Sequence, residues 1–485
     1  MTLSEFGAWY EKRHRRTSSA LTTTAFLCSD LLAVLLSFAW GFFCVKFFSI
    51  LTADGSIINA KSFITYWPYL PAFIVIFQLH RLYPGVSLAP SEEMRRFFIG
   101  SLIVYGGILL SRLIEHERWD SINTAFLVSF VFTTLFLLTA RSITHWVLVK
   151  SKLGGIPAVI YGCGDIGKMV ANCLIGSVRS GYLPVLFLDD NPQGDDYYRD
   201  IPIIHDLKVG PEIVKRYNIK MAIVAMPKLD GSKLKSLLND SVYAFRYNVI
   251  IPNFFNISNI WMSVRDFNGV LGIDTSNKFK LTWNRSVKRV MDLSVTTIGG
   301  IIISPFLLFI ALLVKLSSPG PVFYKQKRLG RNGKYFYAYK FRSMVNNAEE
   351  KLNKLLESDP VLKKEWDETH KLVNDPRVTS FGRFLRRTSF DEFPQLINIL
   401  KGEMSLVGPR PITDSEVSKY GDDYSRVFSI NPGLTGMWQV SGRSDAKYID
   451  RISYDIYYLQ SWSVWLDLWI IFKTFGVVIL GRGAY

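Results

Sequence analysis

The N-terminal part of the chain is dominated by apolar runs at about 20–45, 63–79, 97–113 and 122–140. Each run is close to the roughly 20 residues that a helix needs to cross a bilayer, so the pattern predicts a four-helix transmembrane bundle over residues 1–150. Basic residues precede the first run, separate the second from the third and follow the fourth, namely Lys12, Arg13, Arg15, Arg16, Arg81, Arg95, Arg96, Arg141, Lys150 and Lys152. The positive-inside rule therefore predicts that both ends of the bundle face the cytoplasm.

Asp30 is a carboxylate inside the first apolar run. Such a residue can mark a functional site in a membrane, but it can also cap a helix, lie at the interface or form an interhelical hydrogen bond. The sequence leaves these alternatives open.

Short apolar strands alternate with helical segments in residues 151–265, which predicts a Rossmann-like α/β domain. A first strand leads into a G-x-G-x-x-G turn, and a second strand ends in an acidic residue, which gives the candidate nucleotide-binding residues Gly162, Gly164, Gly167 and Asp189. The same glycines also suit tight turns and close helix packing, so nucleotide binding stays one of two interpretations. The chain contains no Tyr-x-x-x-Lys pair, which disfavours a nucleotide-sugar epimerase and favours a regulatory or structural role.

A fifth apolar run, from Leu293 to Val314, contains no charged residue and is long enough to cross a membrane. Basic residues flank it on both sides, as expected if both ends lie on the cytoplasmic face. Ser304 and Pro305 lie in its middle, where proline breaks or kinks a helix and a serine hydroxyl can bind a freed carbonyl. We therefore expect a re-entrant helical hairpin at about 288–316, the alternative being a kinked spanning helix.

Composition supports a membrane protein with basic faces: 49% of the 485 residues are hydrophobic, yet the formal net charge is +16. The basic excess favours anionic partners, and the hydropathy favours lipid and phosphorylated substrates over nucleic acid. The four cysteines show no metal-ligand spacing and are expected to be buried free thiols. The aromatic segment from Tyr457 to Trp469 suits either a membrane interface or core packing.

Asp391 and Glu392 are the strongest candidates for chemistry. Attack on a diphosphate needs a nucleophile, a metal to neutralise phosphate oxygens and basic groups to hold the ligand, and adjacent carboxylates can supply the first two. The competing interpretation is structural, because Ser389 and Glu392 have the spacing of a capping box that would begin a helix running to Leu400. Taken alone, the local sequence favours the cap, although the two interpretations are compatible.

The C-terminal motifs are SSPGPVFYKQKRLGRNGKYFYAYKFRSM, NDPRVTSFGRFLRRTSFDEFPQLINILKGEMSLVGPRP and NPGLTGMWQVSGR. Over about residues 285–485 the sequence resembles the monotopic bacterial phosphoglycosyl transferases, which transfer sugar 1-phosphates to polyprenyl phosphates. The preceding bundle and α/β domain look like the large members of that family, typified by the undecaprenyl-phosphate galactose phosphotransferases. Phe390 departs from the leucine usual before the acidic pair, a change of apolar bulk.

The resemblance implies a covalent mechanism in which Asp391 attacks the sugar-linked phosphate of a UDP-sugar, UMP leaves, and undecaprenyl phosphate takes the phosphosugar. It implies Mg²⁺ bound by Glu392 and Asp391. Matching positions imply phosphate- or nucleotide-binding roles for the basic residues Lys340, Arg342, Arg386, Arg410 and Arg443. For each lone basic residue, a solvated face or a lipid headgroup contact is the alternative.

Together these expectations describe a mixed membrane protein with a four-helix region (1–150), a Rossmann-like domain (151–265), a linker (266–284) and an α-rich monotopic catalytic domain (285–485). It would lie in the bacterial inner membrane, face the cytoplasm and begin O-antigen, capsule or exopolysaccharide synthesis with UDP-galactose, or with UDP-glucose as the alternative. Its products would pass to downstream membrane glycosyltransferases, and self-association through the middle domain would make a homodimer. The contrasting class is a non-enzymatic assembly or regulatory protein of polysaccharide export.

Overall fold

The computed structural model resolves two compact units, Met1–Asn256 and Ile257–Tyr485, and each is described separately. The residues that the structure describes are 1–14, 19–51, 65–83, 88–116, 119–151, 155–176, 181–190, 196–251, 263–267, 270–274, 279, 282–345, 352, 357, 375, 377–441 and 448–479.

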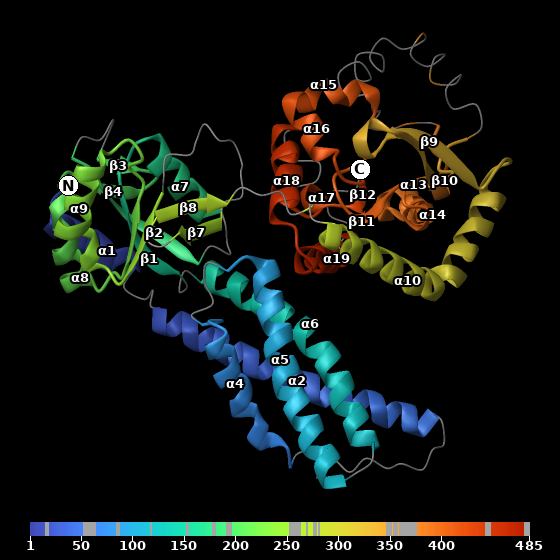
Figure 1. Ribbon diagram of the computed structural model, residues 1–485, viewed down its shortest axis with the longest axis horizontal. Helices are drawn as coiled ribbons and strands as arrows, with labels where there is room; N and C mark the ends of the chain where they lie inside the picture. The colour runs from blue at the N-terminus through green and yellow to red at the C-terminus, as the bar shows by residue number, and fades with distance from the viewer. Residues whose placement is uncertain are drawn as a thin grey trace. The chain divides into compact units, whose positions relative to one another are not determined.

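The first unit contains a bundle of apolar helices that lie side by side, as Figure 1 shows. They are α2 (Ser19–Leu51), α4 (Leu70–Leu79), α5 (Pro90–His116) and α6 (Ser121–Lys150). The first, third and fourth of these are long and apolar enough to cross a membrane, whereas α4 is a shorter apolar helix. Each of the four predicted apolar runs therefore contains a helix, and the beginning of the second run, residues 63 and 64, lies outside the described part of the chain.

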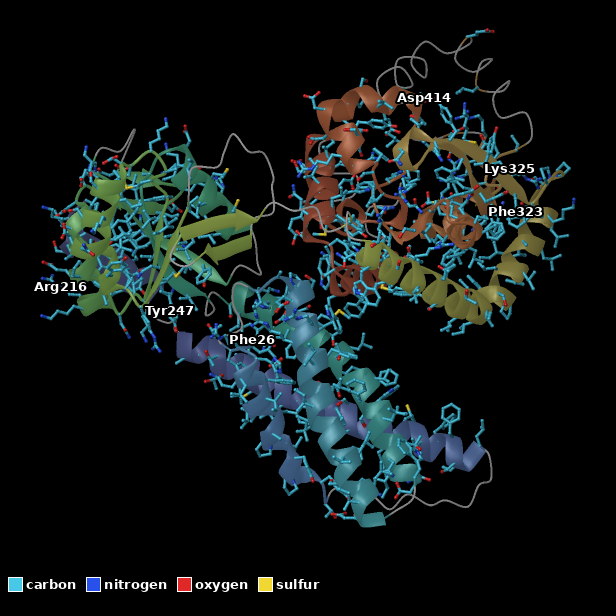
Figure 2. The ribbon with its side chains drawn as sticks, in the orientation of Figure 1. Phe26, Arg216, Tyr247, Phe323, Lys325 and Asp414 are labelled. Carbon is cyan, nitrogen blue, oxygen red and sulfur yellow. The ribbon has the colours of Figure 1, made fainter. Side chains whose placement is uncertain are left out.

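One end of the bundle is held by a buried ion cluster centred on Arg141. Its guanidinium donates to both carboxylate oxygens of Asp30, at 3.0 and 2.7 Å, and to Glu93 at 3.1 Å. The Tyr83 hydroxyl donates to Asp30 at 2.9 Å, and the Phe26 ring lies 4.7 Å from the guanidinium, toward one end of the bundle in Figure 2. Asp30 thus forms interhelical hydrogen bonds, which decides among the alternatives that the sequence left open.

Arg141 is one of the basic residues that follow the fourth apolar run, but it does not lie on the surface. Only 1% of its surface is exposed, and its charge is matched inside the bundle. The cytoplasmic assignment therefore has to rest on the other flanking basic residues, such as Lys150.

The other end of the bundle carries a second polar cluster. Arg112 donates to Asn123 at 2.6 Å and also forms an ion pair with Asp120. The Tyr69 hydroxyl, just before α4, lies 3.1 Å from the Ser111 hydroxyl. Since the chain after α4 reaches the Asp30 cluster, α4 connects the two ends of the bundle.

The second part of this unit is an α/β fold with the strand order β3-β4-β2-β1-β5-β6. The strands are β1 (Ile156–Tyr161), β2 (Tyr182–Leu188), β3 (Tyr197–Tyr198), β4 (Ile201–Ile204), β5 (Met221–Val224) and β6 (Tyr247–Ile250). All neighbours pair in parallel except β3 with β4. Because β1 has parallel neighbours on both sides, the chain winds outward in both directions from it, and the glycine turn after β1 lies where the direction changes.

Helices cover both faces of this sheet (Figure 1). They are α7 (Asp165–Gly176), α8 (Gly210–Tyr217) and α9 (Gly231–Asp240), together with the N-terminal α1 (Leu3–His14). In α1, Phe6 is fully buried and packs edge-on against Tyr217 at 5.2 Å between ring centroids, and Tyr10 joins the same core. Besides its basic residues, α1 therefore has an apolar face that packs on the core of the α/β fold.

The second unit contains the C-terminal motifs. Its main elements are β7 (Ser263–Phe267), β8 (Val270–Asp274), α10 (Thr282–Ser317), β9 (Phe323–Leu329), β10 (Tyr335–Phe341), α13 (Ser380–Thr388), η6 (Phe390–Gln395), α14 (Leu396–Lys401), β11 (Ser405–Val407), β12 (Gly433–Thr435), α17 (Met437–Ser441), α18 (Tyr448–Ser461) and α19 (Val464–Ile479). The strands form three two-stranded sheets, β7-β8, β9-β10 and β11-β12.

Helix α10 bends partway along its length, as Figure 1 shows, and contains Pro305. The Ser304 hydroxyl donates to the Ile301 carbonyl at 2.8 Å, the group that lacks a donor because proline has no amide hydrogen. This confirms the expected role of the serine. Both halves of α10 pack on the same domain: Lys288 donates to Asp467 at 2.8 Å, and Val314 is buried in a cluster with Leu385. The apolar residues around the bend are exposed, including Ile298, Ile301, Ile302, Phe306, Leu308 and Phe309.

The aromatic segment near the C-terminus is part of the core. Tyr458, Trp462 and Trp469 are each less than a tenth exposed, and Tyr458 and Trp462 donate to the buried carboxylate of Asp467. A membrane-interface role is therefore wrong for these three side chains, because all three are buried inside the protein and the polar atoms of Tyr458 and Trp462 are satisfied there.

Replacing the bundle's central arginine, Arg141→Met, leaves Asp30 buried without its arginine counter-charge. Breaking one partner of a buried ion pair costs about 3–5 kcal/mol, so we expect a large fall in Tm of the detergent-purified protein. Arg95→Gln, which removes a half-exposed arginine of α5, serves as the control and should leave Tm nearly unchanged. Equal Tm values for the two variants would contradict a central role for Arg141.

Candidate functional site

The β9-β10 hairpin forms one wall of the site, and its register decides which side chains face inward. Arg328 is paired with Phe336, and Gln326 with Ala338, so these residues share one face of the hairpin with Lys340. The opposite face carries exposed lysines and tyrosines. Because side chains alternate between the two faces of each strand, the cations Arg328 and Lys340 lie on the same face of the hairpin.

The carboxylates lie on a short 3₁₀ helix, η6, that follows α13 after an abrupt turn. Ser389 forms this turn with φ 57°, a left-handed conformation that is uncommon for a residue other than glycine. The Ser389 side chain makes no capping hydrogen bond, and the Glu392 side chain is directed to Lys340 instead. The capping-box interpretation is therefore wrong, because an N-cap residue needs extended backbone to aim its oxygen at the helix amides.

Glu392 is paired with Lys340, whose ammonium donates to Oε1 at 2.7 Å. Burial raises the pKa of the Glu392 carboxyl, but the charges of Lys340 and Arg410 outweigh this effect, so the pKa lies below its ordinary value. Glu392 is thus held ionised.

Asp391 is in a different environment although it is the adjacent residue. Only 8% of its surface is exposed. Burial and then the negative charge of Glu392 raise the pKa of Asp391 to about 6, against the opposing effect of Lys340 and Arg386. The pair therefore combines a carboxylate that stays charged with one that titrates near neutral pH.

Asn398 on α14 fixes the distance between the hairpin and η6. Its fully buried amide accepts from the Tyr339 amide at 3.0 Å and donates to the Tyr337 carbonyl at 2.8 Å. It also donates to Glu403 at 2.6 Å. The Asn398 side chain thus makes hydrogen bonds with the backbone of β10, next to Lys340, that a neighbouring strand would otherwise make. The strand cannot shift without breaking these buried hydrogen bonds.

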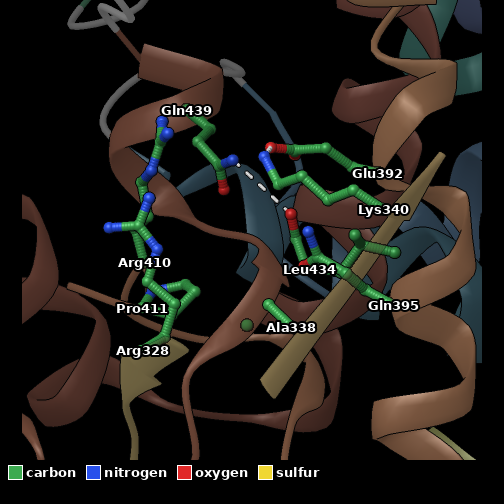
Figure 3. A pocket seen from close by; sticks show the side chains of 10 residues that line it. Arg328, Ala338, Lys340, Glu392, Gln395, Arg410, Pro411, Leu434 and Gln439 are labelled. Carbon is green, nitrogen blue, oxygen red and sulfur yellow. Dashed lines mark hydrogen bonds and ion pairs between the residues drawn. The ribbon is translucent and has the colours of Figure 1, made fainter. Parts of the chain in front are cut away.

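A pocket opens beside Glu392. Its lining is basic and polar, with the residues Arg328, Ala338, Lys340, Glu392, Gln395, Arg410, Pro411, Gly433, Leu434 and Gln439. Figure 3 shows Arg328 and Arg410 on the side of the pocket opposite Glu392 and Lys340. This arrangement suits a ligand with several negative charges.

The backbone around Arg410 is held by a close approach of two glycines. A Cβ on Gly433 would lie 2.1 Å from the amide nitrogen of Gly408. Any side chain at position 433 would therefore clash with the backbone of the neighbouring segment. The Gly433 amide donates to the Pro409 carbonyl at 2.8 Å, and the Arg410 guanidinium lies 5.6 Å from the centre of the Trp438 ring. These contacts direct Arg410 to the pocket.

The remaining predicted basic residues are distributed differently. Arg386 donates to Ser343 at 3.0 Å and acts electrostatically on Asp391. Arg342 is buried and donates to the carbonyls of Val314, Ser318 and Pro321, which caps the C-terminal end of α10. These contacts give Arg342 a structural role. Arg443 lies outside the described residues.

The glycine turn of the α/β domain has two packed positions and one open position. Gly162 has φ 96°, and a Cβ on Gly167 would lie 1.9 Å from the Gly162 carbonyl oxygen. A Cβ on Gly164 would meet nothing within 4 Å. The Cys163 amide donates to Asp189 at 2.6 Å, so this carboxylate stabilises the turn itself. Turn geometry and packing explain Gly162 and Gly167, and nucleotide binding stays a prediction.

Mg²⁺ usually takes one or two carboxylates, substrate phosphates and water, and not a closed set of protein ligands. Within the described ranges, no group of three or more histidine, cysteine, aspartate or glutamate side chains could hold a metal. Asp391 and Glu392, adjacent on η6 and next to a basic pocket, fit the sparse carboxylate set that Mg²⁺ prefers.

Sequence reasoning missed Arg328 and Asn398. Arg328 lies within a motif that carried the resemblance, but only the alternation of the hairpin would have indicated that it faces inward with Lys340. Asn398 gave no signal, because its role depends on a buried contact with a strand nearly 60 positions away in the chain.

Comparisons with known proteins agree with this site. The model of the bacterial sugar transferase family matches residues 283–481, and a CoA-binding domain model matches residues 84–242. The chain is 34% identical to undecaprenyl-phosphate galactose phosphotransferase of Salmonella typhimurium, over 81% of this chain and 82% of that protein. It is 32% identical to UDP-galactose-lipid carrier transferase of Erwinia amylovora, over 76% and 78% of the two chains.

A third relative, UDP-glucose:undecaprenyl-phosphate glucose-1-phosphate transferase of Escherichia coli, is 36% identical over 58% of each chain. The galactose- and glucose-named relatives thus have similar identities to this chain. The match to the Salmonella protein extends over most of both sequences and is joined by the family match over the domain that contains Asp391 and Glu392. This membrane enzyme therefore belongs to the bacterial sugar transferases, the family of polyprenyl-phosphate sugar-1-phosphate transferases.

Proposed function

We propose that the enzyme transfers a hexose 1-phosphate from a UDP-sugar to undecaprenyl phosphate and releases UMP, as the first membrane step of a surface polysaccharide. The observation that carries the proposal is a buried, titratable Asp391 next to an ionised Glu392, which lines a strongly basic pocket. The names of the relatives support undecaprenyl phosphate as the acceptor.

Asp391 is the proposed nucleophile. A carboxylate oxygen of Asp391 forms a bond to the sugar-linked phosphorus, the bond from that phosphorus to the bridging oxygen breaks, and UMP leaves with the electron pair. An oxygen of undecaprenyl phosphate then attacks the same phosphorus and restores the carboxylate. Burial beside cations favours this route, because a partly desolvated carboxylate is a stronger nucleophile than a hydrated one.

Glu392 and Asp391 would hold Mg²⁺, which neutralises phosphate oxygens in this type of transfer. Lys340 holds Glu392 in place and adds positive charge next to Asp391. Arg410 offers its guanidinium to the diphosphate from the opposite side of the pocket. Arg386 and, by resemblance, Arg443 would complete the anion-binding set.

A cytoplasm-facing, re-entrant arrangement is part of the proposal. Both halves of α10 pack on one domain while the apolar residues around its bend are exposed, which supports a helix that enters the bilayer and returns. Before α2, α1 packs on the α/β core, and β1 of the same core follows α6. The two ends of the bundle therefore lie on one side of the membrane, which requires an even number of crossings and supports four spans.

The α/β domain is proposed to be Rossmann-like in topology and regulatory in role, with Gly164 as the open position of its turn. Self-association and transfer of the product to downstream membrane glycosyltransferases complete the proposal. The bacterial inner membrane is the proposed location, because nucleotide sugars are cytoplasmic.

Asp391→Asn tests the mechanism most directly. The variant keeps the shape of the side chain but removes its charge, so UMP release from a UDP-sugar should fall by at least about 10³-fold. Since burial disfavours the charged form, Tm should not decrease. UMP release is measured in detergent or nanodiscs with added undecaprenyl phosphate and Mg²⁺, and persistence of wild-type release would contradict the mechanism.

The pH profile provides an independent test. Asp391 must be ionised to attack, and its pKa of about 6 means that kcat/KM should decrease about tenfold per pH unit below 6. Because this pKa is raised in the folded state, protonation of Asp391 stabilises the fold as pH decreases through 6. A loss of activity at pH 5 should therefore appear without a matching fall in Tm from this group, whereas a flat profile between pH 5 and 7 would contradict the assignment.

The sugar is tested with a panel of UDP-hexoses under identical conditions. We expect UDP-galactose to give the highest kcat/KM for UMP release, in agreement with the two galactose-named relatives that match most of this chain. A higher value for UDP-glucose would reverse the choice of sugar and leave the reaction class intact.

A further inference from the structure

The pocket beside Glu392 has more positive than negative charge. Among the lining residues that the structure describes, Arg328, Lys340 and Arg410 are cationic and only Glu392 is anionic. Lys340 is already paired with that carboxylate at 2.7 Å. Within the lining that the structure describes, the two arginines thus add positive charge that no further carboxylate matches, and such a pocket favours binding of an anion.

Arg328 has a defined position on this pocket. Its side chain is 15% exposed, and its place opposite Phe336 in the hairpin directs it to the inward face. Burial and the nearby charge of Arg410 lower the pKa of its guanidinium, in the direction expected when two cations are held close together. The nearest acidic contact is Glu416 at 3.8 Å, outside the pocket lining.

Glu416 holds Arg328 without neutralising it fully. It accepts from the Thr413 amide at 2.9 Å in a capping box, and it is shared with Arg451 at 3.6 Å. Arg451 stacks on the Trp438 ring at 4.8 Å, the same ring that Arg410 contacts at 5.6 Å. Arg328 and Arg410 are therefore connected through Glu416, Arg451 and Trp438. These contacts hold both arginines in place before a ligand binds, as a preorganised anion site requires.

We propose that Arg328, together with Arg410, binds the phosphate of the leaving nucleotide. This inference rests on the proposed function and assigns the direction of the diphosphate in the site. In phosphoryl transfer the attacking and leaving oxygens lie roughly in line on opposite sides of the phosphorus. Arg328 and Arg410 lie across the pocket from Glu392 and Lys340 in Figure 3, so the UMP side of the donor points to the arginines and the sugar phosphate to the carboxylates.

The test uses UMP as a probe on full-length protein, with Arg328→Gln, Arg328→Lys and the control Arg331→Gln. Arg331 is an exposed arginine three positions along the chain, just after β9. Loss of a charge-assisted phosphate contact should raise the Kd for UMP and the KM for UDP-sugar about 10–100-fold in Arg328→Gln. Arg328→Lys should fall between wild type and Arg328→Gln, and the control should match wild type.

A double variant with Arg410→Gln distinguishes a shared phosphate from two separate effects. If both arginines bind one phosphate, the combined loss in UMP affinity should be smaller than the product of the two single losses. A purely structural role for Arg328 predicts a lower Tm with unchanged Kd for UMP, and that result would overturn the inference while wild-type UMP release still supported the proposed reaction. Failure of the wild type to release UMP from any UDP-sugar would instead remove the proposed function on which the inference rests.

Discussion

Two adjacent carboxylates, the buried Asp391 and the partly exposed Glu392, lie side by side, and the surrounding residues of the catalytic domain compensate for their charge. Such a pair cannot be fully ionised unless nearby cations compensate for the lost hydration and the mutual repulsion. Lys340 and Arg410 keep Glu392 charged, whereas burial and then the charge of Glu392 raise the pKa of Asp391 to about 6. One residue thereby stays charged while its neighbour titrates near pH 6, although they follow each other in the chain.

The framework that supplies these cations is rigid and mostly buried. The Asn398 amide joins α14 to the strand that carries Lys340, and the contact between Gly408 and Gly433 fixes the backbone beside Arg410. Such supports matter because a displacement of about 1 Å in a reacting group can cost a large factor in rate. The strained turn at Ser389 belongs to the same set, since strain near a site persists only where the surrounding contacts enforce it.

Membrane attachment follows a related principle, in which polar groups are satisfied internally and apolar surface is left for lipid. The Asp30 and Arg141 pair closes one end of the bundle inside the protein, whereas the exposed residues around the bend of α10 are apolar. Ser304 compensates for the hydrogen bond that Pro305 removes. The same domain thus combines a basic pocket with an exposed apolar helix bend.

The sequence by itself determined the apolar helices and the βα pattern and singled out Asp391 and Glu392 as candidates, because these depend on local periodicity and on short motifs. It could not decide whether Ser389 caps a helix, whether Trp462 and Trp469 face lipid, or whether Arg141 is exposed, since burial depends on residues distant in the chain. The same reason explains why Arg328 was missed: its inward direction comes from strand register. Only tertiary structure decides which charges share a pocket, because that depends on which segments pack together.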